Sequence, residues 1–248
     1  MREQNSNDQI GVETTTEALI LRKVPYSGSS MIASAYTRDY GIMSFMIRGI
    51  GKKRGNKLSA LEPLAMVDIS FHLREKYEVQ TVKEISAKTS GGLFYDPIKG
   101  SIQLFLAEML YKSLREESSD EELFNYIKSS LEYFNAGIDH TYFHLVFLIK
   151  LSKFFGFFPK GDFDQNTVYF DLQNGMFTSN RNSSLHTIDR EESSAFYKIM
   201  RANYSSSLKI QPEERRRLIY SIVEYYRLHL EGFGEVKSLP VLIEVFST

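Results

Sequence analysis

The spacing of apolar residues changes near residue 90, and this change constrains the fold of the 248-residue chain more than any other feature. Before it, short strand-like runs alternate apolar and polar residues, as in Met66–Phe71 and Tyr77–Val82. After it, apolar residues recur at helical spacing to the end of the chain, with one interruption at 156–184. A period of two is typical of half-buried antiparallel strands, and spacing of three and four is typical of helices. The sequence therefore predicts an α+β protein in which a β domain precedes a helical domain.

Five strands are predicted before the change, in a domain at 16–88 that follows a flexible polar leader at 1–15. Their expected ranges are 17–23, 31–37, 42–49, 64–72 and 77–85. Short strands at this spacing, separated by turn residues, are typical of a small antiparallel barrel. A five-stranded barrel of this length matches the OB-fold, whose strand face and loops commonly bind nucleic acid.

A helical domain is predicted at 89–248. Its segment 139–155 is apolar over most of its circumference, which indicates the buried centre of a bundle. An irregular insert at about 156–186 is expected to form a hairpin, because Asn174-Gly175 is a strong hairpin signal between the strand-like pieces 168–170 and 176–178. The expected signals at helix starts are Ser119 with Glu122, Asp189 with Glu192, and Pro212 in a first turn.

Composition excludes several functional classes. The chain has no cysteine, which excludes disulfides, thiol catalysis and cysteine-ligated zinc. Its glycines at 49, 51 and 55 lack the spacing of a Rossmann or P-loop fingerprint. No secretory signal is visible at the start, and the most apolar stretch, 143–158, is too short to span a bilayer. We therefore expect a soluble cytoplasmic protein.

A net charge of −1 conceals a local excess of cations between residues 22 and 57, where Asp39 is the single acid. Most of these cations lie in the glycine-containing segment 48–57, which is suited to tracking a phosphate chain. A solvated loop that only aids solubility is the alternative, but the position between the third and fourth strands favours nucleic acid. The predicted nucleic-acid-binding residues are Arg22, Lys23, Arg38, Arg48, Lys52, Lys53, Arg54 and Lys57.

Four aromatic residues in the same region are candidates for stacking on unpaired bases. They are Tyr26, Tyr36, Tyr40 and Phe45. Because aromatic side chains are favoured on the faces of strands, core packing is the preferred interpretation for Tyr36 and Phe45.

Short runs follow one another in a recognisable order along most of the chain. The N-terminal runs are Glu17–Arg22, Tyr26–Ser30, Tyr36–Gly41 and Arg48–Lys53. The later runs are Leu61–Leu64, Phe155–Pro159, Tyr225–Leu230 and Lys237–Leu239. Their joint order and spacing, from about residue 15 to the C-terminus, resemble the bacterial recombination and repair family RecO.

This resemblance implies a non-enzymatic recombination mediator that needs no cofactor. Members of the family bind single- and double-stranded DNA and anneal complementary strands. They act in the RecF pathway with RecR and single-stranded-DNA-binding protein to load RecA. The resemblance therefore implies the same partners here, no membrane partner, and a nucleoid-associated cytoplasmic location.

Many members of the family hold zinc through two Cys-x-x-Cys pairs in the insert, and this chain departs from that pattern. The residues at the first pair are Asp162, Phe163, Asp164 and Gln165. Zinc held in that way is therefore excluded. We expect a metal-free hairpin that is held instead by Phe163, Tyr169, Phe170 and Phe177.

The family also docks the acidic, apolar tail of single-stranded-DNA-binding protein on its helical domain. A cation meets the terminal carboxylate of that tail. Lys150 and Lys153 are the candidate cations in this chain, although neither clearly matches a family position. The sequence leaves open whether this contact is kept, altered or absent.

Other functional classes stay open at this point. A protein-interaction adaptor would make the basic loop incidental. A metal-dependent hydrolase would use His140 and His144, but the glutamate of the metalloprotease motif is absent between them. The acid pairs 162/164 and 116/117 accompany no nucleophile. The run 215–217 of three arginines either extends a DNA path or, as we prefer, forms the charged first turn of an exposed helix.

Overall fold

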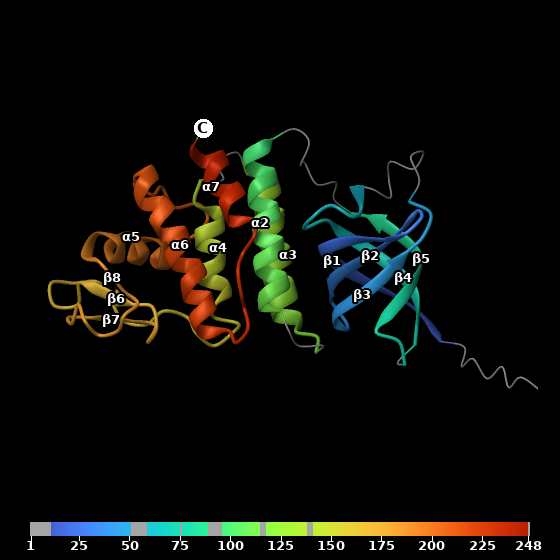
Figure 1. Cartoon of the computed structure of the whole chain (residues 1–248), viewed down its shortest axis with the longest axis horizontal. Coiled ribbons are helices and arrows are strands. Elements are labelled where there is room, and N and C mark those ends of the chain that lie inside the picture. Colours follow the sequence, from blue (N-terminus) through green and yellow to red (C-terminus); the bar gives the residue numbers. More distant parts are fainter. Residues whose placement is uncertain are drawn as a thin grey trace, which may run out of the picture. The chain divides into compact units, whose positions relative to one another are not determined.

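The computed structural model describes residues 11–50, 59–74, 76–88, 96–114, 118–137 and 141–247. The chain forms two compact units, residues 1–128 and residues 129–248. The first unit contains the strands β1–β5, drawn from blue to teal in Figure 1, and the second contains the insert and the later helices.

The five strands of the first unit close into a barrel. They are β1 (Val12–Ser27), β2 (Ser30–Thr37), β3 (Gly41–Ile47), β4 (Met66–Leu73) and β5 (Val79–Ala87). Their order is β1-β2-β3-β5-β4, and β4 pairs with β1 to complete the circle. All pairs are antiparallel except β3 with β5, which run parallel from Ser44 opposite Val79. The predicted five-stranded OB-type barrel is confirmed.

Large and small residues share the interior of the barrel. Phe45 and Phe71 are fully buried, and their rings meet edge to face with centroids 5.1 Å apart. Ala18, Ala33 and Ala35 belong to the same core. A barrel of so few strands has a narrow interior, which two phenylalanine rings fill only if other positions are small.

The strand ends differ from the prediction except at the end of β2, and the starts of β1 and β4 show two physical reasons. β1 begins at Val12 and not near Thr16, because Val12–Thr15 pair with β4, with Val12 opposite Leu73. Threonine and valine are β-branched and favour strands, although their polar context resembles a leader. β4 begins at Met66 and not at residue 64, because Leu64 has a φ of +61° and donates its N–H to the carbonyl of Ile20 at 2.8 Å.

The helices follow the predicted pattern. They are α2 (Pro97–Ser113), α3 (Glu121–Ala136), α4 (Phe143–Leu151), α5 (Arg190–Arg201), α6 (Pro212–His229) and α7 (Leu239–Ser247). Asp189 caps α5 by accepting the N–H of Glu192 at 2.8 Å, as expected. The expected cap of α3 was wrong by one residue, because Asp120 and not Ser119 accepts the N–H of Leu123 at 2.9 Å.

The first unit continues past the barrel into α2 and the beginning of α3. Tyr36 is buried with its ring centroid 5.9 Å from that of Phe124, and the Arg22 guanidinium lies 5.5 Å from the centre of the Tyr111 ring. The compact unit thus ends at Lys128, well after the expected domain boundary at 88/89. That boundary, which describes a change of pattern in the sequence, stays a prediction.

The second unit is built around α4, whose residues Leu145, Phe147 and Leu148 are fully buried. Its insert forms a small sheet of β6 (Tyr169–Asp171), β7 (Met176–Thr178) and β8 (Thr187–Ile188), in the order β7-β6-β8. The predicted hairpin around Asn174-Gly175 is confirmed, with residues 172–175 as its loop and a positive φ of +65° at Gly175, where the loop ends. β8 was not predicted, because a two-residue strand shows no periodicity. No helix in the described residues has the length and apolarity to cross a membrane.

Candidate nucleic-acid interface

The basic loop begins beside the tip of the β1–β2 hairpin. Ile50 donates its N–H to the carbonyl of Ser29 at 2.8 Å, which fixes the chain where it leaves β3. Gly49 before it has a φ of +72°, which allows the sharp exit. Four of the predicted DNA-binding residues, Lys52, Lys53, Arg54 and Lys57, lie outside the described residues. Their DNA contacts stay predictions.

The other four predicted DNA-binding residues have different surroundings. Arg48 is exposed at the end of β3, and Arg22 is exposed on β1 with its guanidinium over Tyr111. Lys23 is half-buried near Glu62. Burial raises the pKa of Glu62, and the positive charge of Lys23 offsets part of this rise. Arg38 contacts residues of its own unit through an ion pair with Glu17, as described below. Arg22 and Arg48 are therefore the exposed residues of the four.

Arg38 belongs to a cluster of three cations around one buried carboxylate. Its Nη2 lies 3.1 Å from Glu17, and the guanidinium centre lies 5.2 Å from the centre of the Phe124 ring. The Nζ atoms of Lys88 and Lys128 lie 3.1 Å and 2.8 Å from Glu17. We call Glu17, Arg38, Lys88 and Lys128 the Glu17 cluster. Arg38 thus already has a structural role, and its contact with DNA stays a prediction.

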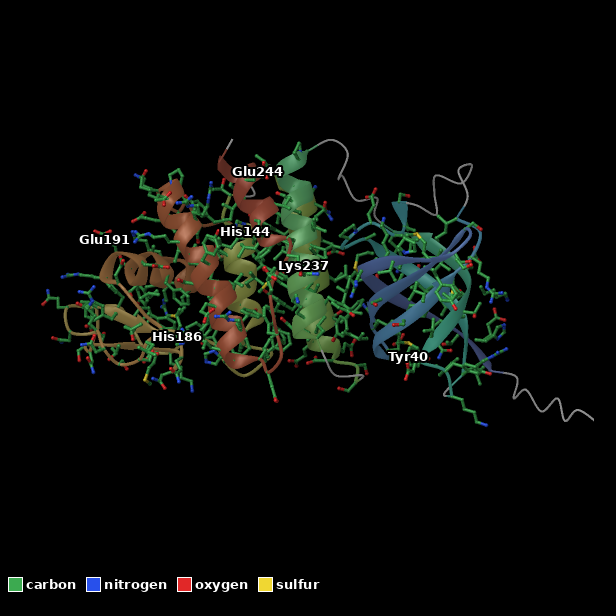
Figure 2. The ribbon with its side chains drawn as sticks, viewed as in Figure 1. Tyr40, His144, His186, Glu191, Lys237 and Glu244 are labelled. Atoms are coloured by element: carbon green, nitrogen blue, oxygen red, sulfur yellow. The ribbon has the colours of Figure 1, made fainter. Side chains whose placement is uncertain are left out.

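The four stacking candidates divide into buried and exposed residues. Tyr36 and Phe45 lie in the core, as preferred from the sequence. Tyr40, labelled in Figure 2, is half-buried, and its hydroxyl lies 3.0 Å from that of Thr14. Tyr26 is 64% exposed near the tip of the β1–β2 hairpin. Of these four rings, Tyr26 is the one that solvent reaches most fully.

A cationic pocket lies where the end of β3 meets the β4–β5 connection. Its cavity is about 400 Å³, and we call it the β4–β5 pocket. Its lining includes three cations, Arg48, Arg74 and Lys83, together with His72, Tyr77 and Gln80. No acid lines it among the described residues. Such a concave surface attracts a polyanion, because several positive charges converge on one cavity.

The loop that carries this pocket is held by the buried side chain of Gln80. Its amide nitrogen donates to the carbonyls of Arg74, at 3.0 Å, and of Tyr77, at 2.6 Å. Its amide oxygen accepts the N–H of Arg74 at 3.0 Å. Tyr77 also donates its own N–H to the carbonyl of Arg74 at 3.1 Å. These bonds tie Arg74 and Tyr77 to the buried Gln80.

The sequence interpretation did not select His72, Arg74, Tyr77 or Lys83 as site residues. They lie outside the cation-rich segment, and acids surround them in the sequence. Nevertheless, the sequence contained a usable signal. In an OB-type barrel the connection between the fourth and fifth strands is a common binding loop, and here it holds an arginine and a tyrosine.

The insert is held by aromatic contacts and by one buried carboxylate. Phe170 and Phe177 are buried with ring centroids 4.8 Å apart, and Phe163 meets Phe177 edge to face at 6.4 Å. Asp171, fully buried, accepts the N–H groups of Gln173 and Asn174 at 3.0 and 3.1 Å. The contacts expected of Phe163, Phe170 and Phe177 are present, whereas the part expected of Tyr169 stays a prediction and the role of Asp171 was not anticipated.

The residues at the zinc position of the family do not fit a metal. Asp164 accepts the N–H groups of Asn166 and Thr167 at 2.7 and 2.8 Å, so it caps a turn of its own loop. Asp162 accepts the hydroxyl of Tyr197 at 2.9 Å. In the described residues no group of three or more histidine, aspartate or glutamate side chains is placed to bind a metal ion.

His144, labelled in Figure 2, is fully buried on α4 and stacks on Phe246 with ring centroids 5.3 Å apart. Burial, helped by the charge of Arg215, lowers the pKa of His144 to about 3, so the ring is neutral at pH 7. His140, its proposed partner in a metal site, lies outside the described residues, as do Glu116 and Glu117. These surroundings are those of a core histidine.

A second pocket, of about 450 Å³, lies between the start of α6 and the end of α7. We call it the α6–α7 pocket, and its lining includes Arg215, Arg216, Ile219, Ile243 and Phe246. The Arg215 guanidinium lies 4.5 Å from the centre of the Phe246 ring. The first turn of α6 is charged as preferred from the sequence, with Arg216 paired to Glu213 at 2.6 Å. Lys150 and Lys153 are not part of this lining.

Comparison with known proteins identifies relatives along almost the whole chain. The family model for the recombination protein O N-terminal domain matches residues 12–90, and the model for its C-terminal domain matches residues 95–240. A DNA repair protein RecO from Azobacteroides pseudotrichonymphae is 36% identical over 239 residues, which cover 93% of this chain and 98% of the relative. One from Bacteroides fragilis is 37% identical over 240 residues, with 93% and 98% covered. One from Flavobacterium johnsoniae is 28% identical over 240 residues, with 95% and 100% covered.

Proposed function

Because the chain belongs to the RecO family of DNA repair proteins, we propose that it binds single- and double-stranded DNA and anneals complementary strands. The observation that carries this proposal is the β4–β5 pocket, where three cations and an exposed tyrosine meet on an OB-type barrel. Cations would neutralise phosphates and release counterions, and rings would hold bases without reading their sequence. Contacts of this kind tolerate any sequence, as annealing requires.

The proposed role is non-catalytic and located in the cytoplasm at the nucleoid. The protein would act with RecR and single-stranded-DNA-binding protein in the RecF pathway, and would help RecA to load on coated strands. A test mixes the purified protein with complementary strands that single-stranded-DNA-binding protein already coats. Faster duplex formation than in its absence supports the proposal. An unchanged rate contradicts annealing.

The basic loop makes the first prediction for this function. Replacing Lys52, Lys53 and Arg54 together with alanine should weaken binding to single strands and reduce the slope of log affinity against log salt. The expected reduction is about 0.7–1 slope unit per lost phosphate contact, or about two to three units in all. Filter binding over a salt series measures it.

A matched control removes the same charge from the second unit, by replacing the exposed Lys160, Lys198 and Lys209 with alanine. If both triple variants reduce the slope equally, only net charge matters and the loop is not a contact. If the wild-type protein does not bind DNA at all, the adaptor alternative is correct.

The α6–α7 pocket supports a proposal about the tail of single-stranded-DNA-binding protein. That tail is acidic and apolar and ends in a carboxylate. The pocket combines guanidinium groups with the apolar side chains Ile219, Ile243 and Phe246. Guanidinium groups suit carboxylates because they donate two parallel hydrogen bonds. We therefore propose this pocket as the docking site in place of Lys150 and Lys153.

Replacing Arg216 with alanine should weaken binding of a fluorescent tail peptide about tenfold, the value of one charge-assisted hydrogen bond. Amidation of the peptide C-terminus should weaken binding to the wild type by a similar factor. Replacing Lys153 with alanine is the control and should change little. If Lys153→Ala weakens peptide binding and Arg216→Ala does not, the docking site lies near the end of α4 instead. Fluorescence anisotropy measures each affinity.

A further inference from the structure

The β4–β5 pocket has a preformed shape that points to a particular ligand. Its loop is tied by three hydrogen bonds of the buried Gln80 side chain, so the positions of Arg74 and Tyr77 are set in advance. A preformed pocket loses little conformational entropy when it binds. Its volume of about 400 Å³ is in the range of about 300–1,000 Å³ that is typical of sites for small molecules.

The aromatic wall of the pocket is open to a stacking partner. Tyr77 is 53% exposed although its carbonyl is bound by the side chain of Gln80. The guanidinium of Arg74 lies over the Tyr77 ring, 5.8 Å from the centre of that ring, so a cation already stands on the aromatic group on which a base would stack. Stacking of a base on an aromatic ring is favourable for every base, because each has a π face.

Three cations surround the same cavity from three places in the barrel. Arg48 comes from the end of β3, Arg74 from the loop, and Lys83 from β5. Lys83 is paired with Glu13 at 2.6 Å, but both side chains are more than half exposed. An exposed ion pair of this kind contributes little, so the lysine is available to a phosphate.

From these observations we propose that the β4–β5 pocket binds one unpaired nucleotide of a DNA strand, with its base on Tyr77 and its phosphates on Arg48 and Arg74. The proposal rests on the DNA-binding function proposed above and adds the form of DNA that this pocket selects. In a duplex each base is covered by its neighbours and paired across the helix. Only an unpaired base can stack on the Tyr77 ring. The pocket therefore favours single strands over duplexes.

The test measures the affinity of the full-length protein for a mixed-sequence single strand and for the matching duplex. Tyr77→Ala should weaken single-strand binding by about 5- to 100-fold, the value of one stacked base. It should change duplex binding less than twofold. Tyr77→Phe should keep the wild-type affinity for both forms, because the ring is retained. The fluorescence of a 2-aminopurine base in the single strand should be quenched on binding to the wild type, and Tyr77→Ala should reduce this quenching.

Two controls separate this contact from general effects. Tyr220 on α6 is exposed to nearly the same extent, at 51%, and Tyr220→Ala should change neither affinity. Arg74→Ala should reduce the salt slope for single strands by about one unit, whereas Tyr77→Ala should leave the slope unchanged.

The outcomes distinguish the pocket from the general function. If Tyr77→Ala affects both forms equally, or neither, while the wild type binds DNA with a normal salt slope, the nucleotide pocket is wrong and the DNA-binding function stands. If the wild type binds neither form, the proposed function itself fails. Circular dichroism of each variant confirms that its fold is kept.

Discussion

Replacing Asp171 with alanine is expected to lower the free energy of unfolding of the insert by about 3–5 kcal/mol, the largest effect of any single substitution discussed for this protein. The carboxylate is fully buried and accepts two backbone N–H groups in the β6–β7 turn. It also accepts hydrogen bonds from the side-chain amide of Asn174, at 2.7 Å, and from the hydroxyl of Ser184, at 2.8 Å. Alanine would leave these four part-buried donors without their common acceptor.

The effect should depend on pH in a defined direction. Burial by itself raises the pKa of Asp171, but hydrogen bonds from Ser183, Asn174 and Ser184 lower it further, to about 2 from an ordinary 3.8. A group whose folded pKa is depressed stabilises the fold above its unfolded pKa. The contribution is lost as the pH falls from about 4 toward 2. The gap in stability between wild type and Asp171→Ala should therefore narrow in that window.

Hydrogen exchange of the peptide 157–188 in the full-length protein measures this local stability. Asp164→Ala is the matched control, because Asp164 accepts the same kind of turn hydrogen bonds but is exposed, so its loss should destabilise the insert much less. Equal losses for both variants, or a gap that does not change with pH, would contradict a special role for Asp171. The result would show that a carboxylate holds the hairpin where the family commonly uses zinc.

The second large effect is expected for Glu17→Gln, which should destabilise the first unit by about 2–4 kcal/mol. Glu17 is 8% exposed and lies within 3.1 Å of cationic nitrogens of Arg38, Lys88 and Lys128. Glutamine keeps the shape but removes the charge, so three cations would repel one another around a neutral side chain. Lys88 retains a second partner, Asp68 at 3.0 Å, which limits the loss.

Glu13→Gln on the same strand is the control for this prediction. Glu13 pairs only weakly with Lys83, because both side chains are exposed, so the substitution should change stability much less than Glu17→Gln does. Burial raises the pKa of Glu17, but the hydrogen bonds and charges of Lys128 and Lys88 lower it below its ordinary 4.5. The wild type should therefore lose this contribution as the pH falls below about 4.5, and Glu17→Gln should not. Urea unfolding followed by circular dichroism at pH 7 and pH 4 measures both effects, and equal losses for Glu13→Gln and Glu17→Gln would contradict them.

The same variant tests the DNA contact that the sequence predicted for Arg38. Loss of the carboxylate frees the guanidinium from its partner inside the unit. If Arg38 lies along the DNA path, Glu17→Gln should raise the affinity for single strands and steepen the salt slope. If Arg38 serves only to hold the first unit together, affinity should stay unchanged while stability falls.

The order of the strands and helices could be predicted because it depends on local periodicity. Alternation in Met66–Phe71 and the turn at Asn174-Gly175 predicted β4 and the β6–β7 hairpin. Pairing with β4 moves the start of β1 back to Val12, and the positive φ of Leu64 moves the start of β4 from residue 64 to Met66. Periodicity does not report either effect, because one depends on a distant strand and the other on a single dihedral angle.

The sequence alone determined that a β-barrel precedes helices, and that cations gather before residue 58, because both follow from residues close together in the chain. Only the tertiary structure decided which cations remain open. Barrel closure brings Arg48 beside Arg74 and Lys83, but it places Arg38 against Glu17. An exposed ion pair such as that of Lys83 with Glu13 leaves its cation available to a ligand. Arg38 is not available in this way, because a buried opposite charge from elsewhere in the fold lies against it. The fold, and not the local sequence, determines which opposite charges do so.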